Sequence, residues 1–264
     1  MKIPRPVAFA SGIIVACASL LVPHVPFLSS APPVFAAGTC STDRNSHTGY
    51  ESLLHGGYGS RAWIVSRIPS LCSGGTPTGG DSISAWSMIL DTNGINYAQS
   101  GYTQNAGQNS TYYFSEYSDS GCSGGACTRY LGATTDGNNN QFWETYDQGD
   151  HSIYMFIDGS IVQATPYDPT NSGGANYWPG PWSQQYLGEN YNVQDDMPGT
   201  SGEKATFTSV AYSPTPSNFN GNVQDNWQPI VNPQLAKVTT YWCVDGFNNN
   251  AFNIWTQGTC PSGT

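Results

Sequence analysis

Few residues in this chain could carry out chemistry, and most of them are glutamates. The sequence has no H-E-x-x-H, G-x-S-x-G or P-loop segment, so zinc, serine-nucleophile and nucleotide sites are not expected. Beyond residue 37 the histidines are scattered singly. We therefore expect no metal and no organic cofactor, which leaves proton transfer by carboxylates. The glutamates beyond residue 37 are Glu51, Glu116, Glu144, Glu189 and Glu203.

Two of these glutamates lie within aromatic stretches. Glu116 belongs to Tyr112-Tyr-Phe-Ser-Glu-Tyr117 and Glu144 to Phe142-Trp-Glu-Thr-Tyr146. A carboxyl group surrounded by aromatic rings is desolvated, so its pKa should be raised. The alternative for each is a structural rim carboxylate that only accepts a hydrogen bond from a tyrosine.

A glutamine and another glutamate lie in stretches with the alternation of strands. Gln99 stands in Tyr97-Ala-Gln-Ser-Gly-Tyr102 and Glu189 in Tyr186-Leu-Gly-Glu-Asn-Tyr191. A carboxylate can move a proton, and an amide can donate hydrogen bonds without titrating. Brought face to face across a β-sandwich, the two side chains would form a hydrolytic site.

The cysteines indicate disulfides rather than catalysis. Seven are present, and six remain if Cys17 leaves with the leader. An even count in an exported chain predicts three bridges. Proximity favours Cys122 with Cys127, Cys40 with Cys72, and Cys243 with Cys260.

The N-terminus resembles an export signal. Lys2 and Arg5 precede an apolar run, and small residues suited to cleavage end near Ala36 or Ala37. A lipoprotein box at Cys17 is the alternative. The apolar run is too short and too interrupted by proline to span a membrane. We expect a secreted, extracellular protein with no membrane contact in its mature form.

The composition is acidic but poor in charge. The formal net charge is −10, it would become −12 without Lys2 and Arg5, and only 10% of residues are charged. Such a balance repels phosphate backbones, so nucleic acid is not an expected partner. With few ion pairs to lose on protonation, the composition suits an acidic exterior, although many secreted β-proteins share it. We expect a monomer acting on a neutral or basic substrate.

Strand signals separated by turn residues predict an all-β fold, an antiparallel β-sandwich or jelly roll. Residues 73–80 look like a linker, and residues 166–183 like a long functional loop. We expect a signal peptide at 1–37, an N-terminal disulfide-tied segment at 38–80, a sandwich at 81–213 and a C-terminal extension at 214–264. The segment 38–80 is either an inhibitory prosegment or an ordinary strand. Expected strands span residues 83–90, 95–101, 111–117, 141–146, 152–157, 160–165, 184–190, 205–212 and 238–244.

Six segments, in order, resemble the eqolisin family of glutamic peptidases. That family runs through W-V-G-I-D, L-Q-T-G, Y-E-W-Y, G-D-x-I, A-E-W-I-V-E-D and V-T-F-T segments. The match covers residues 83–213, about half of the chain. The corresponding segments here are Ala85-Trp-Ser-Met-Ile-Leu90, Tyr97-Ala-Gln-Ser-Gly101, Tyr113-Phe-Ser-Glu-Tyr117, Gly149-Asp-His-Ser-Ile153, Gly188-Glu-Asn-Tyr-Asn-Val-Gln-Asp195 and Ala205-Thr-Phe-Thr-Ser-Val210.

The resemblance implies a concanavalin A-like sandwich and a secreted, acid-acting endopeptidase. Its catalytic pair would be Gln99, which orients water and stabilises the oxyanion, and Glu189, which acts as the base. Several family positions differ here, including Thr103 and Asn190, so the resemblance leaves specificity open. Residues implied to shape substrate binding are Trp86, Phe114, Glu116 and Tyr117.

Two readings compete with a peptidase that acts on polypeptides. A non-catalytic carbohydrate-binding sandwich could stack a glycan on Tyr177, Trp178, Trp182 and Tyr186. A glycoside hydrolase could use a glutamate pair such as Glu116 and Glu189. We expect Trp178 and Trp182 to contact the substrate.

Overall fold

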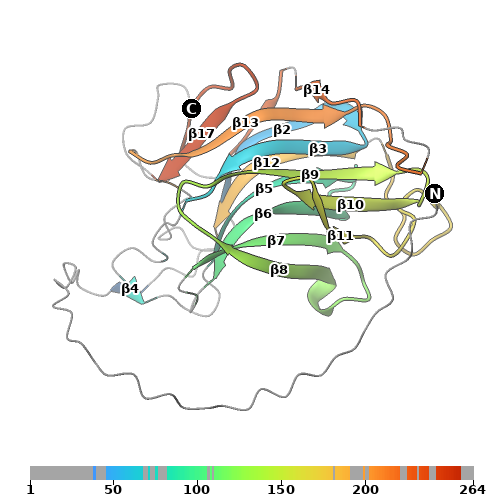
Figure 1. The fold of residues 1–264 in the computed structure, drawn as a ribbon, viewed down its shortest axis with the longest axis horizontal. Helices are drawn as coiled ribbons and strands as arrows, with labels where there is room; N and C mark the ends of the chain where they lie inside the picture. Colours follow the sequence, from blue (N-terminus) through green and yellow to red (C-terminus); the bar gives the residue numbers. More distant parts are fainter. Residues whose placement is uncertain are drawn as a thin grey trace, which may run out of the picture.

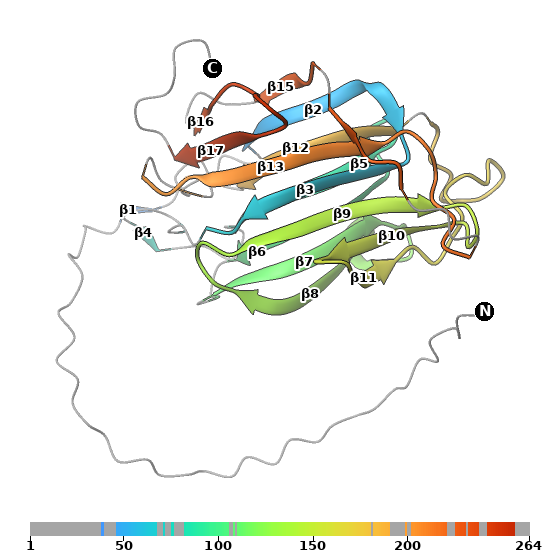
Figure 2. The same cartoon turned by 45° about the horizontal axis from the view of Figure 1, so that its top comes forward.

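The computed structural model shows an all-β protein built from two stacked antiparallel sheets (Figures 1 and 2). It describes residues 46–67, 82–105, 110–180, 182–190, 202–220, 225–230, 232–237 and 242–256, with a few isolated positions. The predicted fold class is therefore confirmed. The described part of the chain holds no helix with the length and hydrophobicity of a membrane span. Its helical structure is one 3₁₀ turn, Ser123–Gly125.

One sheet has seven strands in the order β15-β2-β12-β5-β6-β7-β8. All six pairings are antiparallel, as expected for a jelly roll. The bounds are β15 Gln234–Lys237, β2 Ser46–Gly57, β12 Trp182–Asn190, β5 Ser82–Leu90, β6 Tyr97–Asn105, β7 Thr111–Ser118 and β8 Ala126–Thr134.

The other sheet has eight strands in the order β11-β10-β9-β3-β13-β17-β16, with β14 paired to β13. A separate parallel pair joins β1 (Gly38–Thr39) to β4 (Gly75–Thr76). The bounds are β11 Ser160–Ala164, β10 Ser152–Ile157, β9 Asn139–Asp147, β3 Gly59–Val65, β13 Ala205–Ser213, β17 Phe252–Thr256, β16 Trp242–Val244 and β14 Gln228–Pro229.

The sandwich is wider than residues 81–213, which corrects the predicted boundaries. β2 lies between β15 and β12, and β3 lies between β9 and β13. Removing residues 46–65 as a prosegment would therefore split both sheets. At the other end of the chain, β15, β16 and β17 also belong to the two sheets rather than to a separate extension.

The predicted local disulfide is observed, and a tight turn joins β10 to β11. Asp158 and Gly159 both have positive φ between β10 and β11, the conformation that a tight hairpin turn requires. Cys122 is bonded to Cys127 at the start of β8. Cys243 is also disulfide-bonded, but its predicted partner Cys260 lies outside the described residues. The predicted Cys40 to Cys72 bridge lies outside them as well.

A buried glutamate links the two sheets across the core. Glu144 of β9 is 0% exposed. It accepts hydrogen bonds from Ser100 Oγ of β6 and, at 3.0 Å, from Ser87 Oγ of β5. The Ser87 hydroxyl also lies 2.6 Å from that of Ser60 on β3. We call Glu144, Ser60, Ser87 and Ser100 the glutamate clasp.

Burial raises the pKa of Glu144 well above its usual value, although the bonds from Ser100 and Ser87 partly oppose this shift. The folded chain therefore keeps a proton that the unfolded chain releases near pH 4.5. The stability contributed by this proton is complete below that pH. It is lost as the pH rises through the folded-state pKa.

We expect Glu144→Gln to flatten the pH dependence of stability, because the amide has no proton to release. In the native chain the free energy of unfolding should fall as the pH rises from about 4.5. Urea denaturation at a series of pH values measures both slopes. Glu203→Gln, at an exposed position, is the matched control. Equal slopes for native chain and Glu144→Gln would contradict the assignment.

Candidate functional site

Five predicted site residues lie on one surface of the seven-stranded sheet. We call this surface, which faces away from the eight-stranded sheet, the outer face. In the register Gln99 stands opposite Met88 and Glu116, and Glu189 stands opposite Ser84. Because side chains alternate along strands, these positions share a face with Trp86 and Phe114. The outer-face site consists of Trp86, Gln99, Phe114, Glu116 and Glu189.

Glu116 fixes the orientation of the Gln99 amide. Gln99 Nε2 donates to Glu116 Oε1 at 3.0 Å. A carboxylate only accepts hydrogen bonds, so the NH₂ end of the amide must face it. This leaves the second N–H and the carbonyl oxygen of Gln99 for another partner.

The carboxylate of Glu116 has two more donors. The hydroxyl of Tyr97 donates to Oε1 at 2.7 Å, and the hydroxyl of Thr128 donates to Oε2. Three donors therefore stabilise its negative charge. These hydrogen bonds hold the Glu116 side chain in one position on the outer face.

Glu189 has the titration properties of an acid–base group. Its pKa is raised chiefly by burial and further by the negative charge of Glu116. Trp86 opposes the shift because its indole N–H lies near the carboxylate, although this contact falls short of a full hydrogen bond. The side chain keeps part of its surface exposed. A partly accessible carboxyl with a raised pKa can take up and return a proton in acid.

Gln99 and Glu189 are not direct neighbours. They lie in the same sheet, two strands apart and offset by four positions, which places their Cα atoms about 16 Å apart in a flat sheet. Trp86 on the intervening strand β5 lies midway along this diagonal. A substrate must therefore lie over Trp86 to reach both. The expected contact across the sandwich is not observed.

An apolar floor supports the site. Trp86, Met88, Phe114 and Leu187 pack into one buried cluster on the outer face. Gly101, opposite Trp86, makes room for it, since a Cβ there would lie 2.8 Å from the Trp86 Cβ. This contact explains the glycine two residues after Gln99.

His47 of β2 stands opposite Glu189. Burial lowers its pKa, so the imidazole stays neutral over a wider pH range than usual.

A second amide and carboxylate pair lies in the same row of the outer face. Gln185 Nε2 of β12 donates to Glu51 Oε2 of β2 at 3.0 Å. This pair stands on the other side of Met88 from Gln99 and Glu116. It repeats their chemistry at a different place, which makes it a matched control.

The structure places three predicted substrate-binding residues away from the outer face. Tyr117 points into the core, where it packs against Tyr167. Trp178 and Trp182 are 1% and 3% exposed, so they are not open stacking platforms. Tyr186, proposed with them to stack a glycan, is 1% exposed and donates to the Ala211 carbonyl.

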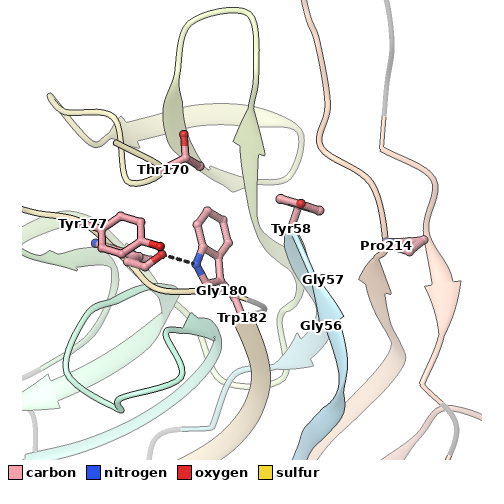
Figure 3. Close-up of a pocket in the computed structure, with 9 residues that line it drawn as sticks. Gly56, Gly57, Tyr58, Thr170, Tyr177, Gly180, Trp182 and Pro214 are labelled. Atoms are coloured by element: carbon pink, nitrogen blue, oxygen red, sulfur yellow. Dashed lines mark hydrogen bonds between the residues drawn. The ribbon is translucent and has the colours of Figure 1, made fainter. Parts of the chain in front are cut away.

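Trp178 and Trp182 line a pocket of about 490 Å³ at one end of the sandwich (Figure 3). Its walls come from Tyr58 in the β2–β3 turn, from the loop 166–181 and from Pro214 after β13. Figure 3 shows the Trp182 indole between Tyr177 and Tyr58. We call this the end pocket; its remaining lining residues are Thr170, Gly56, Gly57 and Gly180.

One grouping of candidate metal ligands is found among the described residues, namely Asp119, Cys122 and Cys127. Both sulfur atoms are joined in a disulfide, so neither is a thiolate ligand. This grouping does not fit a metal ion.

Comparisons with known proteins bear on the fold alone. No protein-family profile matches the sequence, and no curated protein matches it significantly. The chain is similar to a solved structure of a pseudo β-1,3-glucanase antigen of Mycobacterium tuberculosis, with 12% identity, a TM-score of 0.35, and coverage of 81% of this chain and 69% of that one.

Two further solved structures are similar in the same way. A carbohydrate-binding module of Bacillus subtilis has 13% identity, a TM-score of 0.28, and coverage of 64% and 82%. A marine PL7 alginate lyase of Zobellia galactanivorans has 15% identity, a TM-score of 0.27, and coverage of 59% and 55%, so this chain spans about half of its length. These likenesses carry no functional argument, and none supports membership of the glutamic peptidase family.

The electrostatic coupling in the outer-face site is testable. Glu116→Gln should lower the pKa of Glu189, because a negative neighbour is removed. Trp86→Phe should raise it, because the opposing N–H is lost. Carboxyl ¹³C NMR titration measures both shifts, with Glu51→Gln as the control. An unchanged Glu189 titration in Glu116→Gln would show that the two groups are not coupled.

Proposed function

We propose that the outer-face site hydrolyses peptide bonds in acid, in a protein exported from the cell. The observation that carries the proposal is the shared face. A Gln99 amide anchored by Glu116 and a Glu189 carboxyl of raised pKa flank one tryptophan. A register shift of one residue would have turned any of these side chains into the core.

The chemistry follows from the two groups. Ionised Glu189 takes a proton from a water molecule as the water oxygen attacks the peptide carbonyl carbon. By the spacing given above, Gln99 lies too far from Glu189 to contact the same carbonyl, so its second N–H donates to a substrate carbonyl farther along the chain and positions the substrate. Glu189 then returns the proton to the amide nitrogen, and the carbon–nitrogen bond breaks. Trp86 and Phe114 are 5% and 4% exposed, so they support the site from beneath rather than offering an open stacking surface.

Peptide hydrolysis fits the hydrogen bonds better than glycoside hydrolysis. A glycosidase needs a second carboxylate free to act as nucleophile or base. Glu116 is the candidate, but its oxygens already accept bonds from Tyr97, Gln99 and Thr128. Peptide hydrolysis, by contrast, can use one carboxylate that first takes a proton from water and then returns it to the leaving nitrogen.

The decisive experiment is digestion of an unfolded protein by the purified mature chain between about pH 3 and 7, a range that extends well above 4.5 because the pKa of Glu189 is raised. Glu189→Gln should lower the rate by about 10²–10⁴-fold because the base is lost. Gln99→Ala should raise KM by about tenfold with a smaller change in kcat, because one substrate-positioning hydrogen bond is lost.

The controls are Glu51→Gln and Gln185→Ala, which remove the same functional groups from the second pair. Both should digest at the native rate. The proposal would be falsified if the native chain cleaved nothing across the range, or if Glu189→Gln cleaved as fast as Glu51→Gln.

The pH profile gives an independent check. A base must be ionised, so the rate should fall as the pH drops through the pKa of Glu189. Glu116→Gln should move this acid limb to lower pH, because it removes the charge that raises that pKa. Rate measurements against pH for the native chain and Glu116→Gln test this. An acid limb that stays in place would contradict the assignment of Glu189 as the base.

A further inference from the structure

The end pocket is remote from the outer-face site. Trp182 begins β12 and Glu189 lies near its other end, seven residues along the strand. The two residues also differ in parity, so Trp182 faces the core side of the sheet while Glu189 faces outward. The end pocket therefore calls for a ligand of its own. Its volume of about 490 Å³ falls within the usual range for small-ligand sites.

The lining indicates a neutral ligand with a flat apolar face. None of the nine lining residues, all of them within the described part of the chain, carries a charge. The rings of Tyr58 and Tyr177 are 36% and 38% exposed, which leaves them open for stacking. The buried indole of Trp182 braces Tyr58 edge-on, at 5.7 Å between ring centroids.

A hydroxyl in the lining has room for one more donor. Thr170 Oγ1 donates its single proton to Asp168 Oδ1 at 2.7 Å. The hydroxyl of Tyr146 lies 3.2 Å from Thr170 Oγ1 and 3.1 Å from His151 Nδ1, and any bond between the two hydroxyls uses the Tyr146 proton because that of Thr170 is already donated. One lone pair of Thr170 Oγ1 remains, and it can accept a hydrogen bond from a ligand hydroxyl.

We propose that the end pocket binds a pyranose ring of a neutral glycan. A pyranose presents a C–H face that can stack on Tyr58 and Tyr177, and a rim of hydroxyls that can donate to Thr170. A proline-rich peptide could also stack on the two rings, but proline has no N–H to donate to Thr170. Binding requires no bond cleavage, so the proposal stands apart from the role of Glu189.

Calorimetric titration of the purified mature chain tests the proposal. The probes are laminarihexaose, cellohexaose and maltohexaose, each at up to about 10 mM, with decaproline as the competing peptide. At least one glucan should bind saturably. Tyr177→Ala should weaken that binding by about tenfold, because one stacking face is lost.

Gly180→Leu provides a second variant, which adds side-chain bulk to the pocket wall. A Cβ at Gly180 would meet its nearest neighbour, Trp182 Nε1, at 3.9 Å. Gly180→Leu should abolish glucan binding. Tyr130→Ala, which removes a tyrosine that is 54% exposed on β8, should leave the binding unchanged. An unchanged thermal unfolding curve shows that a variant is folded. If Tyr177→Ala does not fold, the binding measured for Gly180→Leu tests the proposal.

Three results would overturn the proposal. They are failure of all three glucans to bind, native-like glucan binding by Gly180→Leu, and binding of decaproline in place of the glucans. The last would identify a peptide site.

Discussion

The pairing of β5 with β6 is the constraint on which the rest of the molecule depends. Ser87 and Ser100 are partners in this pairing, and both donate to Glu144 from the opposite sheet. Met88 and Gln99, the next pair along, point the other way. A slip of one residue would leave Glu144 without its donors and turn Gln99 inward. The glutamate clasp therefore sets both the stacking of the sheets and the composition of the outer face.

Carboxyl groups have different roles on the core side and on the outer face of the seven-stranded sheet. In the core, Glu144 is shielded from water and meets neutral hydroxyls, so it favours the protonated form. On the outer face, Glu116 holds an amide in one orientation, and its charge reaches Glu189. All three residues are glutamates, and their different surroundings give each of them a different role.

Much of the fold was predictable because it is encoded locally. Eight expected strands correspond to β5, β6, β7 and β9–β13, since alternation and turn residues mark them. β2 was missed because it contains Gly49, Gly56 and Gly57, which lower strand propensity. Gly49 is required by a distant contact, since a Cβ there would lie 2.2 Å from the Tyr186 carbonyl. β8 was missed because it is a largely exposed edge strand without a clear apolar period.

Five of the eight predicted site residues share the outer face, but their arrangement could not be predicted. The common face of Gln99, Glu116 and Glu189 and the hydrogen bond from Gln99 to Glu116 both depend on strand pairings that no local pattern reveals. The predicted stacking role of the aromatic residues in the loop before β12 was not observed, because the sequence does not show whether an aromatic ring is exposed or packed in the core. Trp178 and Trp182 proved to be packed, and the open rings are Tyr58 and Tyr177.

The glutamate clasp also sets an upper limit on the conditions in which this protein can work. Under the proposed mechanism Glu189 must be ionised, so activity requires a pH that is not too low. Glu144 keeps the fold at full strength only while protonated, so stability requires a pH that is not too high. Glu189 thus sets the lower limit of the pH range in which the protein is active, and Glu144 sets the upper limit of the range in which it is most stable. At a higher pH, Glu189 would stay ionised, but the chain would lose part of the stability that protonated Glu144 contributes.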